Sequence, residues 1–187
     1  GISIAYEAAK RGAEVLLVIG QTEEFELPGV VVKKAETARE MNYLLHEEVI
    51  QSDCLVMTAA VADARPRQYS DEKISKSDLL KIDLEENPDI LKSLVSGKKS
   101  NQVFVGFAAE TNTDYLNRGI KKMHEKGVDL LYVTNVAGGK VFGEDFTSGA
   151  LLSKTGQKWE FENAKILAVA SSMCDQIEKQ FLQSEVL

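Results

Sequence analysis

Hydrophobic and polar positions along this chain follow two alternating patterns. Short apolar runs rich in valine, isoleucine and leucine are typical of buried strands, and longer stretches with an apolar stripe are typical of helices. Strands are predicted at 14–20, 30–33, 54–58, 103–109 and 128–133, with an extended segment at 80–84 and a hairpin formed by 149–153 and 158–161 around the turn 154–157. Helices are predicted at 1–12, 38–50, 87–95, 114–126 and 163–182.

Residues with strong positional preferences mark several of the predicted helix ends. Thr37 followed by Glu40 has the sequence of a capping box. Asn87 is a good N-cap, and Pro88 suits the first helical position. Glycines follow three of the predicted helices, at Gly12, Gly97 and Gly127, and glycine is the residue that most often ends a helix.

Strands that alternate with helices predict a parallel sheet covered on both faces. We therefore expect one α/β domain over residues 1–187, three-layered, Rossmann-like and doubly wound, with an antiparallel hairpin near its C-terminal end. In such a fold a strand and a glycine-rich turn precede the first helix. Since this chain opens directly on a helix, we expect that the natural protein begins upstream and that its first strand and turn are not in this sequence.

Composition narrows the class of protein. Hydrophobic residues make up 44% and charged residues 27%, the ordinary mixture of a globular protein, and the net charge of −7 disfavours a general nucleic-acid binder. No apolar run reaches the roughly 18 residues of a membrane span, and the first residues do not form a signal peptide. Cys54 and Cys174 belong to no metal motif and indicate reduced structural thiols in a cytoplasmic protein.

The stretch 53–76 carries the clearest chemical signal. Small residues at 59–63 follow the predicted strand 54–58, and ligands of open α/β sheets collect beyond the carboxyl ends of strands. The segment 64–76 is polar, with Lys73 and Lys76 one helical turn apart, which suits a flap over an anionic ligand. A solvated surface loop with ordinary lysines is the alternative, and it is the commoner case.

Other candidate ligand contacts lie further along the chain. There is no Walker A loop and no GxGxxG fingerprint, so a phosphate group would be held by other means. The helix start at 87–90 offers free backbone N–H groups, although a capped structural helix has the same sequence. Lys122 and Lys126 project from one helix face, either toward a shared anion or into water. Phe107, among glycine and alanines, suits a planar ligand or the core.

Taken in order, these motifs are similar to those of one enzyme family. They are AAVAD at 59–63, KISK at 73–76, NPDI at 87–90, GFAAET at 106–111 and KMHEKGVD at 122–129. Together they resemble phosphopantothenoylcysteine synthetase, a bacterial enzyme of coenzyme A biosynthesis that is often fused behind a flavin-dependent decarboxylase. In that family CTP activates the carboxylate of 4′-phosphopantothenate as an acyl-cytidylate, and the amine of L-cysteine then forms the amide.

The resemblance implies roles for individual residues. Lys73 would be catalytic, contacting the phosphates as the flap closes. The implied nucleotide-binding residues are Met57, Thr58, Ala59, Asp63, Lys73, Asn87, Pro88, Asp89, Ile90, Phe107, Lys122 and Lys126. Mg²⁺ is expected to arrive with the triphosphate and to be held by phosphate oxygens and waters, with no metal-ligating residue in the chain. A homodimer with active sites near the subunit contact is also implied.

The chain departs from the family pattern in three places, and two alternatives remain. Ser75 interrupts the flap lysines, and Thr134-Asn135 stands where the family has A-N-D. The segments that serve phosphopantothenate lie upstream, so this chain alone is expected to bind nucleotide but ligate little. A non-catalytic nucleotide-binding domain fits the departures, and an NAD(P)-dependent Rossmann oxidoreductase fits the alternation of strands and helices. At this level CTP and ATP are not distinguished, nor are the fusion partner and the oligomeric state.

Overall fold

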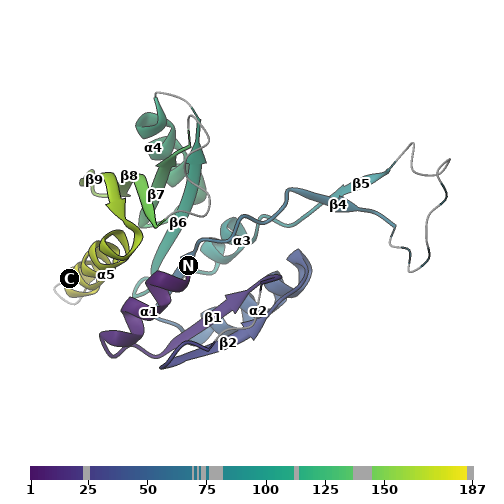
Figure 1. The fold of residues 1–187 in the computed structure, drawn as a ribbon, viewed down its shortest axis with the longest axis horizontal. Helices are drawn as coiled ribbons and strands as arrows, with labels where there is room; N and C mark the ends of the chain where they lie inside the picture. The colour runs from purple at the N-terminus through teal and green to yellow at the C-terminus, as the bar shows by residue number, and fades with distance from the viewer. Residues whose placement is uncertain are drawn as a thin grey trace.

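The computed structural model describes residues 1–22, 26–68, 70, 72, 75, 82–111, 114–136 and 145–184. Its centre is a five-stranded sheet in the order β3-β6-β7-β8-β9 (Figure 1). The strands are β3 (Cys54–Met57), β6 (Val103–Glu110), β7 (Leu130–Asn135), β8 (Phe146–Ser153) and β9 (Lys158–Lys165). The first three run parallel and the last two antiparallel, which confirms the predicted sheet and its C-terminal hairpin.

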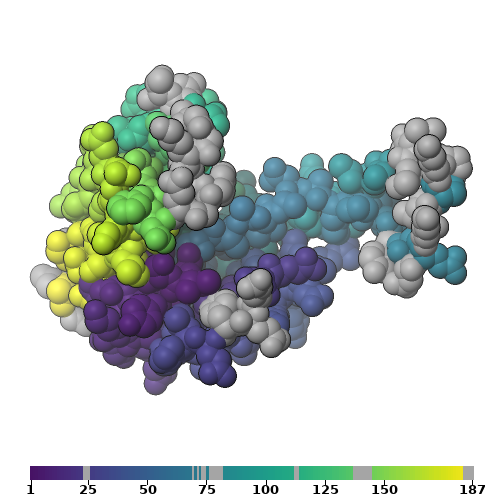
Figure 2. All heavy atoms as spheres, viewed as in Figure 1, coloured from purple at the N-terminus to yellow at the C-terminus, as the bar shows by residue number. Residues whose placement is uncertain are grey.

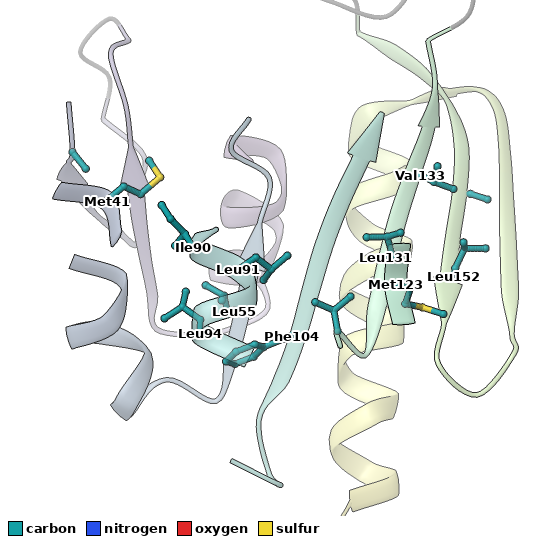
Figure 3. Packing of buried hydrophobic residues seen from close by; sticks show 13 residues of the cluster. Met41, Leu55, Ile90, Leu91, Leu94, Phe104, Met123, Leu131, Val133 and Leu152 are labelled. Atoms are coloured by element: carbon teal, nitrogen blue, oxygen red, sulfur yellow. The ribbon is translucent and has the colours of Figure 1, made fainter. Parts of the chain in front are cut away.

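Helices cover both faces of this sheet. The helices are α1 (Ile2–Lys10), α2 (Ala38–Glu48), α3 (Ile90–Ser96), α4 (Tyr115–Lys126) and α5 (Ile166–Ser184). One apolar cluster joins α2, α3 and α4 to the face that carries Phe104 and Leu131 (Figure 3). A second cluster joins α5, with α1 beside it, to the face that carries Val105 and Leu130. Since successive strand residues point to opposite faces, these strands feed both clusters, and the molecule has three layers.

Two further strands form a sheet of their own. β1 (Val15–Ile19) and β2 (Val30–Lys34) pair in parallel, and β1 pairs with no other described strand. The segments at 14–20 and 54–58 were expected to be buried strands, but only Ile19 and Leu55 are buried. The reason is that β1 and β3 each have one partner strand among the described residues, so one edge of each lacks the cover that a neighbouring strand would provide.

Local signals in the sequence placed some helix ends correctly. Thr37 caps α2 through its side chain, and the Glu40 carboxylate returns to the Thr37 N–H, which confirms the capping box. Gly127 ends α4 in the left-handed region at φ 70°. The α-helical part of α2 ends at Glu48, earlier than the predicted Ile50, and continues as a short 3₁₀ turn.

Two predicted helix starts are wrong. α3 begins at Ile90 with Asp89 as its N-cap, because the side chain of Asn87 is bonded to other parts of the chain and does not cap. α5 begins at Ile166 and not near Asn163, because β9 continues to Lys165 and stays paired with β8. The N–H of Asn163 donates to Ser148 Oγ at 2.9 Å within that hairpin.

A thin arm projects from the body of the molecule (Figures 1 and 2). It consists of β4 (Ala64–Pro66) and β5 (Leu84–Glu86), which pair antiparallel. The predicted flap at 64–76 therefore starts as a strand. Of the expected extended segment at 80–84, residues 82–84 are described, and β5 begins at Leu84. Lys73 and Lys76 lie outside the described residues. None of the described helices has the length and apolarity needed to cross a membrane.

Candidate functional site

The parallel strands β3, β6 and β7 end at one edge of the sheet, and the predicted site residues gather there. Met57 is the last residue of β3 and packs, half-buried, against the cluster beneath α3 and α4. Thr58 follows on the α1 side, where a Cβ built on Gly1 would come within 2.8 Å of its Oγ1. Phe107 lies on the α5 side of β6, with its ring centroid 5.5 Å from that of Tyr132. Ala59 is exposed beyond the strand end.

Asn87 connects three segments at this edge. Its side-chain Nδ2 donates to the Ala62 carbonyl at 2.9 Å, and its Oδ1 accepts from Arg65 Nη1 at 2.6 Å. Its backbone N–H donates to the Asp63 carbonyl at 2.8 Å. The AAVAD and NPDI motifs are therefore fastened together. Both polar ends of the Asn87 side chain are in use, so its part in ligand binding would be to shape the loop.

The start of α3 already holds a negative charge. Asp89 accepts from the Lys92 N–H at 3.2 Å and pairs with Lys126 Nζ at 2.5 Å. Burial alone would raise the pKa of Asp89, but the bonds from Lys126 and the Lys92 N–H outweigh it and hold the pKa below its usual value. The helix start predicted to attract an anion is thus occupied by its own carboxylate. Pro88 and Ile90 flank this cap, with Ile90 buried in the core.

Glu110, the last residue of β6, forms a second charged group. Its Oε1 lies 2.5 Å from Lys122 Nζ, and its Oε2 lies 3.0 Å from Arg118 Nε. The bond from Lys122 lowers the pKa of Glu110, burial opposes that effect, and the charge of Arg118 adds to it. Lys122 was expected to face either an anion or water, together with Lys126. Each lysine instead has its own carboxylate.

The structure connects some of the predicted site residues and adds others to the site. Lys126 is bonded to Asp89, and Asn87 is bonded to the Ala62 carbonyl. Met57 packs against the apolar cluster that contains Ile90, whereas Lys122 pairs with Glu110 at the end of β6. The side chain of Asp63 is exposed, and its carbonyl makes the contact with Asn87.

Sequence reasoning missed Glu110, Arg118 and Arg65. The spacing of Arg118, four residues before Lys122, was a usable signal for one of them. Across the described part of the chain, no group of three or more histidine, cysteine, aspartate and glutamate side chains is placed to hold a metal ion.

Comparison with known proteins gives consistent matches. Residues 1–181 match the family model of the DNA/pantothenate metabolism flavoprotein C-terminal domain. The chain is 36% identical over 188 residues to the coenzyme A biosynthesis bifunctional protein CoaBC of Mycobacterium tuberculosis, covering 95% of this chain and 45% of that protein. It is 33% identical over 182 residues to the protein of the same name from Haemophilus influenzae, covering 96% of this chain and 45% of that one.

A solved structure agrees with these sequence matches. The C-terminal domain of a coenzyme A biosynthesis bifunctional protein CoaBC superposes with a TM-score of 0.81 at 30% identity, covering 98% of this chain and 82% of that one. The chain spans less than half the length of the curated relatives it matches.

Proposed function

Because the chain belongs to the family of DNA/pantothenate metabolism flavoprotein C-terminal domains, we propose that it is a phosphopantothenate–cysteine ligase of coenzyme A biosynthesis. The observation that carries the proposal is the pairing of the motif residues. Lys126 pairs with Asp89 of NPDI, NPDI is joined to AAVAD through Asn87, and Lys122 pairs with Glu110 of GFAAET. The bifunctional relatives are proteins of coenzyme A biosynthesis, which supports the same pathway.

The proposed reaction has two steps. The carboxylate of 4′-phosphopantothenate attacks the α-phosphorus of CTP, forming an acyl-cytidylate and releasing pyrophosphate. The amine of L-cysteine then attacks the acyl carbon, the amide bond forms, and CMP leaves. The first step brings two anions together, and in the second step CMP leaves with additional negative charge, so fixed cations near the phosphates lower both barriers. We assign this role to Lys122 and Lys126, and Lys73 joins them in the proposal because of its motif.

The remaining contacts in the proposal are assigned by position. Ala59 and its neighbours let the nucleotide approach the backbone where β3 ends, and Phe107 offers a partly exposed ring. Mg²⁺ would come with the triphosphate and neutralise part of its charge. The carboxylates of Asp89 and Glu110 are already paired with lysines, which fits a metal held mainly by phosphate oxygens and water.

The proposal also covers the oligomeric state, the fused domain and the cellular compartment. Two-stranded ribbons are marginally stable alone in water, so the projecting arm of β4 and β5 suits a homodimer in which a second copy covers it. Fusion to a flavin-dependent decarboxylase domain is proposed because the curated relatives are bifunctional and much longer than this chain. Cys54 and Cys174 are both free thiols, the state expected in the reducing cytoplasm, where we place the enzyme.

Isothermal titration with CTP, ATP and NADH in the presence of Mg²⁺ tests the proposal. We expect selective binding of CTP. Lys126→Met should weaken it about tenfold or more, since a charge-assisted hydrogen bond contributes about 1.5–3 kcal/mol. Lys121→Met is the matched control, because Lys121 lies on the same helix with its side chain 79% exposed and pairs only weakly with Glu125 at 3.7 Å.

Other outcomes separate the alternatives. Binding of NADH alone would favour the nicotinamide-dependent oxidoreductase and end the ligase proposal. Binding of CTP without release of pyrophosphate, in a protein that carries the upstream segment and is supplied with 4′-phosphopantothenate, would favour a non-catalytic nucleotide-binding domain.

A further inference from the structure

Three cations form a line along α4. Arg118, Lys122 and Lys126 follow one another at intervals of four residues, which places them on one face of the helix. Arg118 and Lys122 pair with a single carboxylate, that of Glu110, each through a different one of its two oxygens. The carboxylate is nearly buried, with its side chain 6% exposed, whereas the two cations are about half exposed. One buried negative charge therefore stands behind two positive charges that remain open to solvent.

We propose that Glu110 is a positioning residue that holds Arg118 and Lys122 side by side as a two-cation site for the phosphate chain of the nucleotide. The inference rests on the proposed function for the identity of the nucleotide. It adds two residues to the site, Arg118 as a phosphate contact and Glu110 as the group that fixes both cations.

The backbone of Glu110 gives the carboxylate a fixed place. Glu110 is paired with Asn135 in the β6–β7 register, and its carbonyl accepts the Val136 N–H at 2.8 Å. A carboxylate on a paired strand end restricts the long side chains that bond to it. Restricting flexible binding groups before the ligand arrives lowers the cost of association, which is the general advantage of preorganisation.

Charge balance explains why the pair would still attract a phosphate group. One carboxylate neutralises one of the two cations, so a net positive charge remains at the surface of α4. The guanidinium of Arg118 uses its Nε toward Glu110, and its terminal amino groups suit bidentate contact with a phosphate group.

A competing role for Glu110 predicts the opposite sign. If the carboxylate merely competed with the ligand for the two cations, then removing its charge would strengthen phosphate binding. If it positions the cations, removing its charge would weaken binding. If Glu110 has a purely structural role and only ties α4 to β6, removing its charge would lower the stability of the fold. Replacing Arg118 would then leave phosphate binding unchanged.

The experiment compares Glu110→Gln, Arg118→Gln and their double variant with the control Lys121→Gln, by isothermal titration with CTP and with inorganic tripolyphosphate. Each single variant should weaken binding of both probes about tenfold, which corresponds to 1.4 kcal/mol. The double variant should be little worse than either single one, because residues that act as a unit are not additive. Glu110→Asp should recover part of the affinity, and Lys121→Gln should match the unaltered chain.

Several results would overturn the inference. Tighter binding in Glu110→Gln would make the carboxylate a competitor, and unchanged binding in Arg118→Gln would remove the second cation. If the unaltered chain binds CTP while both variants bind it equally well, the proposed function stands and the inference fails. If it binds tripolyphosphate but not CTP, and the variants lose that binding, the inference stands and the proposed function fails. Binding of neither probe would overturn both, and urea unfolding of Arg118→Gln checks that the fold is retained.

Discussion

Asp129 is the least exposed carboxylate among the described residues, and it lies at the opposite end of β7 from Asn135. It precedes β7, is 3% exposed, and pairs with Lys98 Nζ at 3.0 Å and with Lys154. Its Oδ2 accepts the Phe104 N–H at 2.7 Å. Burial alone would raise the pKa of Asp129, but the bonds from Lys154, the Phe104 N–H and Lys98 together lower it. This group stabilises the fold by joining β6, β7 and the β8–β9 turn.

We expect Asp129→Asn to lower the free energy of unfolding by about 3 kcal/mol at pH 7, since removing one charge of a buried pair leaves the other uncompensated. Because the folded pKa lies below the unfolded one, this stabilisation is present above about pH 4 and is lost as the pH falls through the folded pKa. Urea denaturation at pH 7 and near pH 3 should show the difference between variant and unaltered chain shrinking.

Glu160→Gln is the control for this prediction. Its pair with Lys158, at 2.6 Å, is exposed on both sides, and exposed pairs contribute about 0–1 kcal/mol. Equal losses in the two variants at pH 7 would contradict the structural role assigned to Asp129.

At the residue scale, sequence could predict interactions between near neighbours and missed those between distant ones. The bond between Thr37 and Glu40 depends on a spacing of three residues, so it was visible in the sequence. Glu110 and Lys122 belong to different elements, and they meet only because α4 packs against β6. Asn87 has the right chemistry for a cap, but its partners Ala62 and Arg65 come from another segment.

Among the elements, the β7–β8 pair depends on a close approach at Gly149. A Cβ at this position would come within 2.4 Å of the Val133 carbonyl oxygen and 3.0 Å of Tyr132 Oη. The β8–β9 register also shifts between Thr147 and Gly149. A side chain here meets backbone that belongs to a paired strand, so it cannot be accommodated by a change of rotamer alone.

Gly149→Ala should therefore lower the free energy of unfolding by about 2–3 kcal/mol, the cost typical of overpacking. Thermal unfolding followed by circular dichroism would measure it. Gly97→Ala is the matched control, because Gly97 has φ −103° and the nearest atom that a Cβ there would meet, the Leu94 carbonyl oxygen, is 3.8 Å away. A variant at Gly149 as stable as the one at Gly97 would show that β7 and β8 separate more easily than the structure indicates.

The type of each element could be predicted better than its limits. Periodicity is local, so the sequence identified the five helices and the strands of the main sheet. Element ends depend on competition with the neighbouring segment. β9 continues past Asn163 because β8 offers it partners up to Phe146, and no pattern within 158–165 reveals that.

At the scale of the whole molecule, the arm is the feature that predicts association with a second copy of the chain. Ile82 lies two residues before Leu84, the first residue of β5, and each is 58% exposed. Residues two apart in extended chain lie on the same side, so they form a small apolar strip. The sequence shows a mixture of apolar and polar residues in this segment. It does not show that the segment projects away from the core, because that depends on how β4 and β5 leave the sheet.

We expect the chain to sediment as a dimer, and the double variant Ile82→Lys with Leu84→Lys to sediment as a monomer with little change in the thermal unfolding of the body. The reason is that charged side chains disfavour burial of this strip in an interface. Analytical ultracentrifugation over a range of concentrations would measure the change. Ile50→Lys is the control, since Ile50 is 60% exposed on the body. A monomeric unaltered chain, or a dimer that only the Ile50 variant disrupts, would contradict this assignment.

The hydrogen bonds of Asn87 connect the base of the arm to the start of α3. Its side chain donates to the Ala62 carbonyl and accepts from Arg65, and Asp89, two residues later, is the N-cap of α3. The base of the arm and the start of α3 are therefore linked through one residue. A torque applied to the arm by a second subunit would reach the loop where the nucleotide is proposed to sit. By thermodynamic reciprocity, if association of the subunits strengthened nucleotide binding by some factor, the nucleotide would strengthen association of the subunits by the same factor.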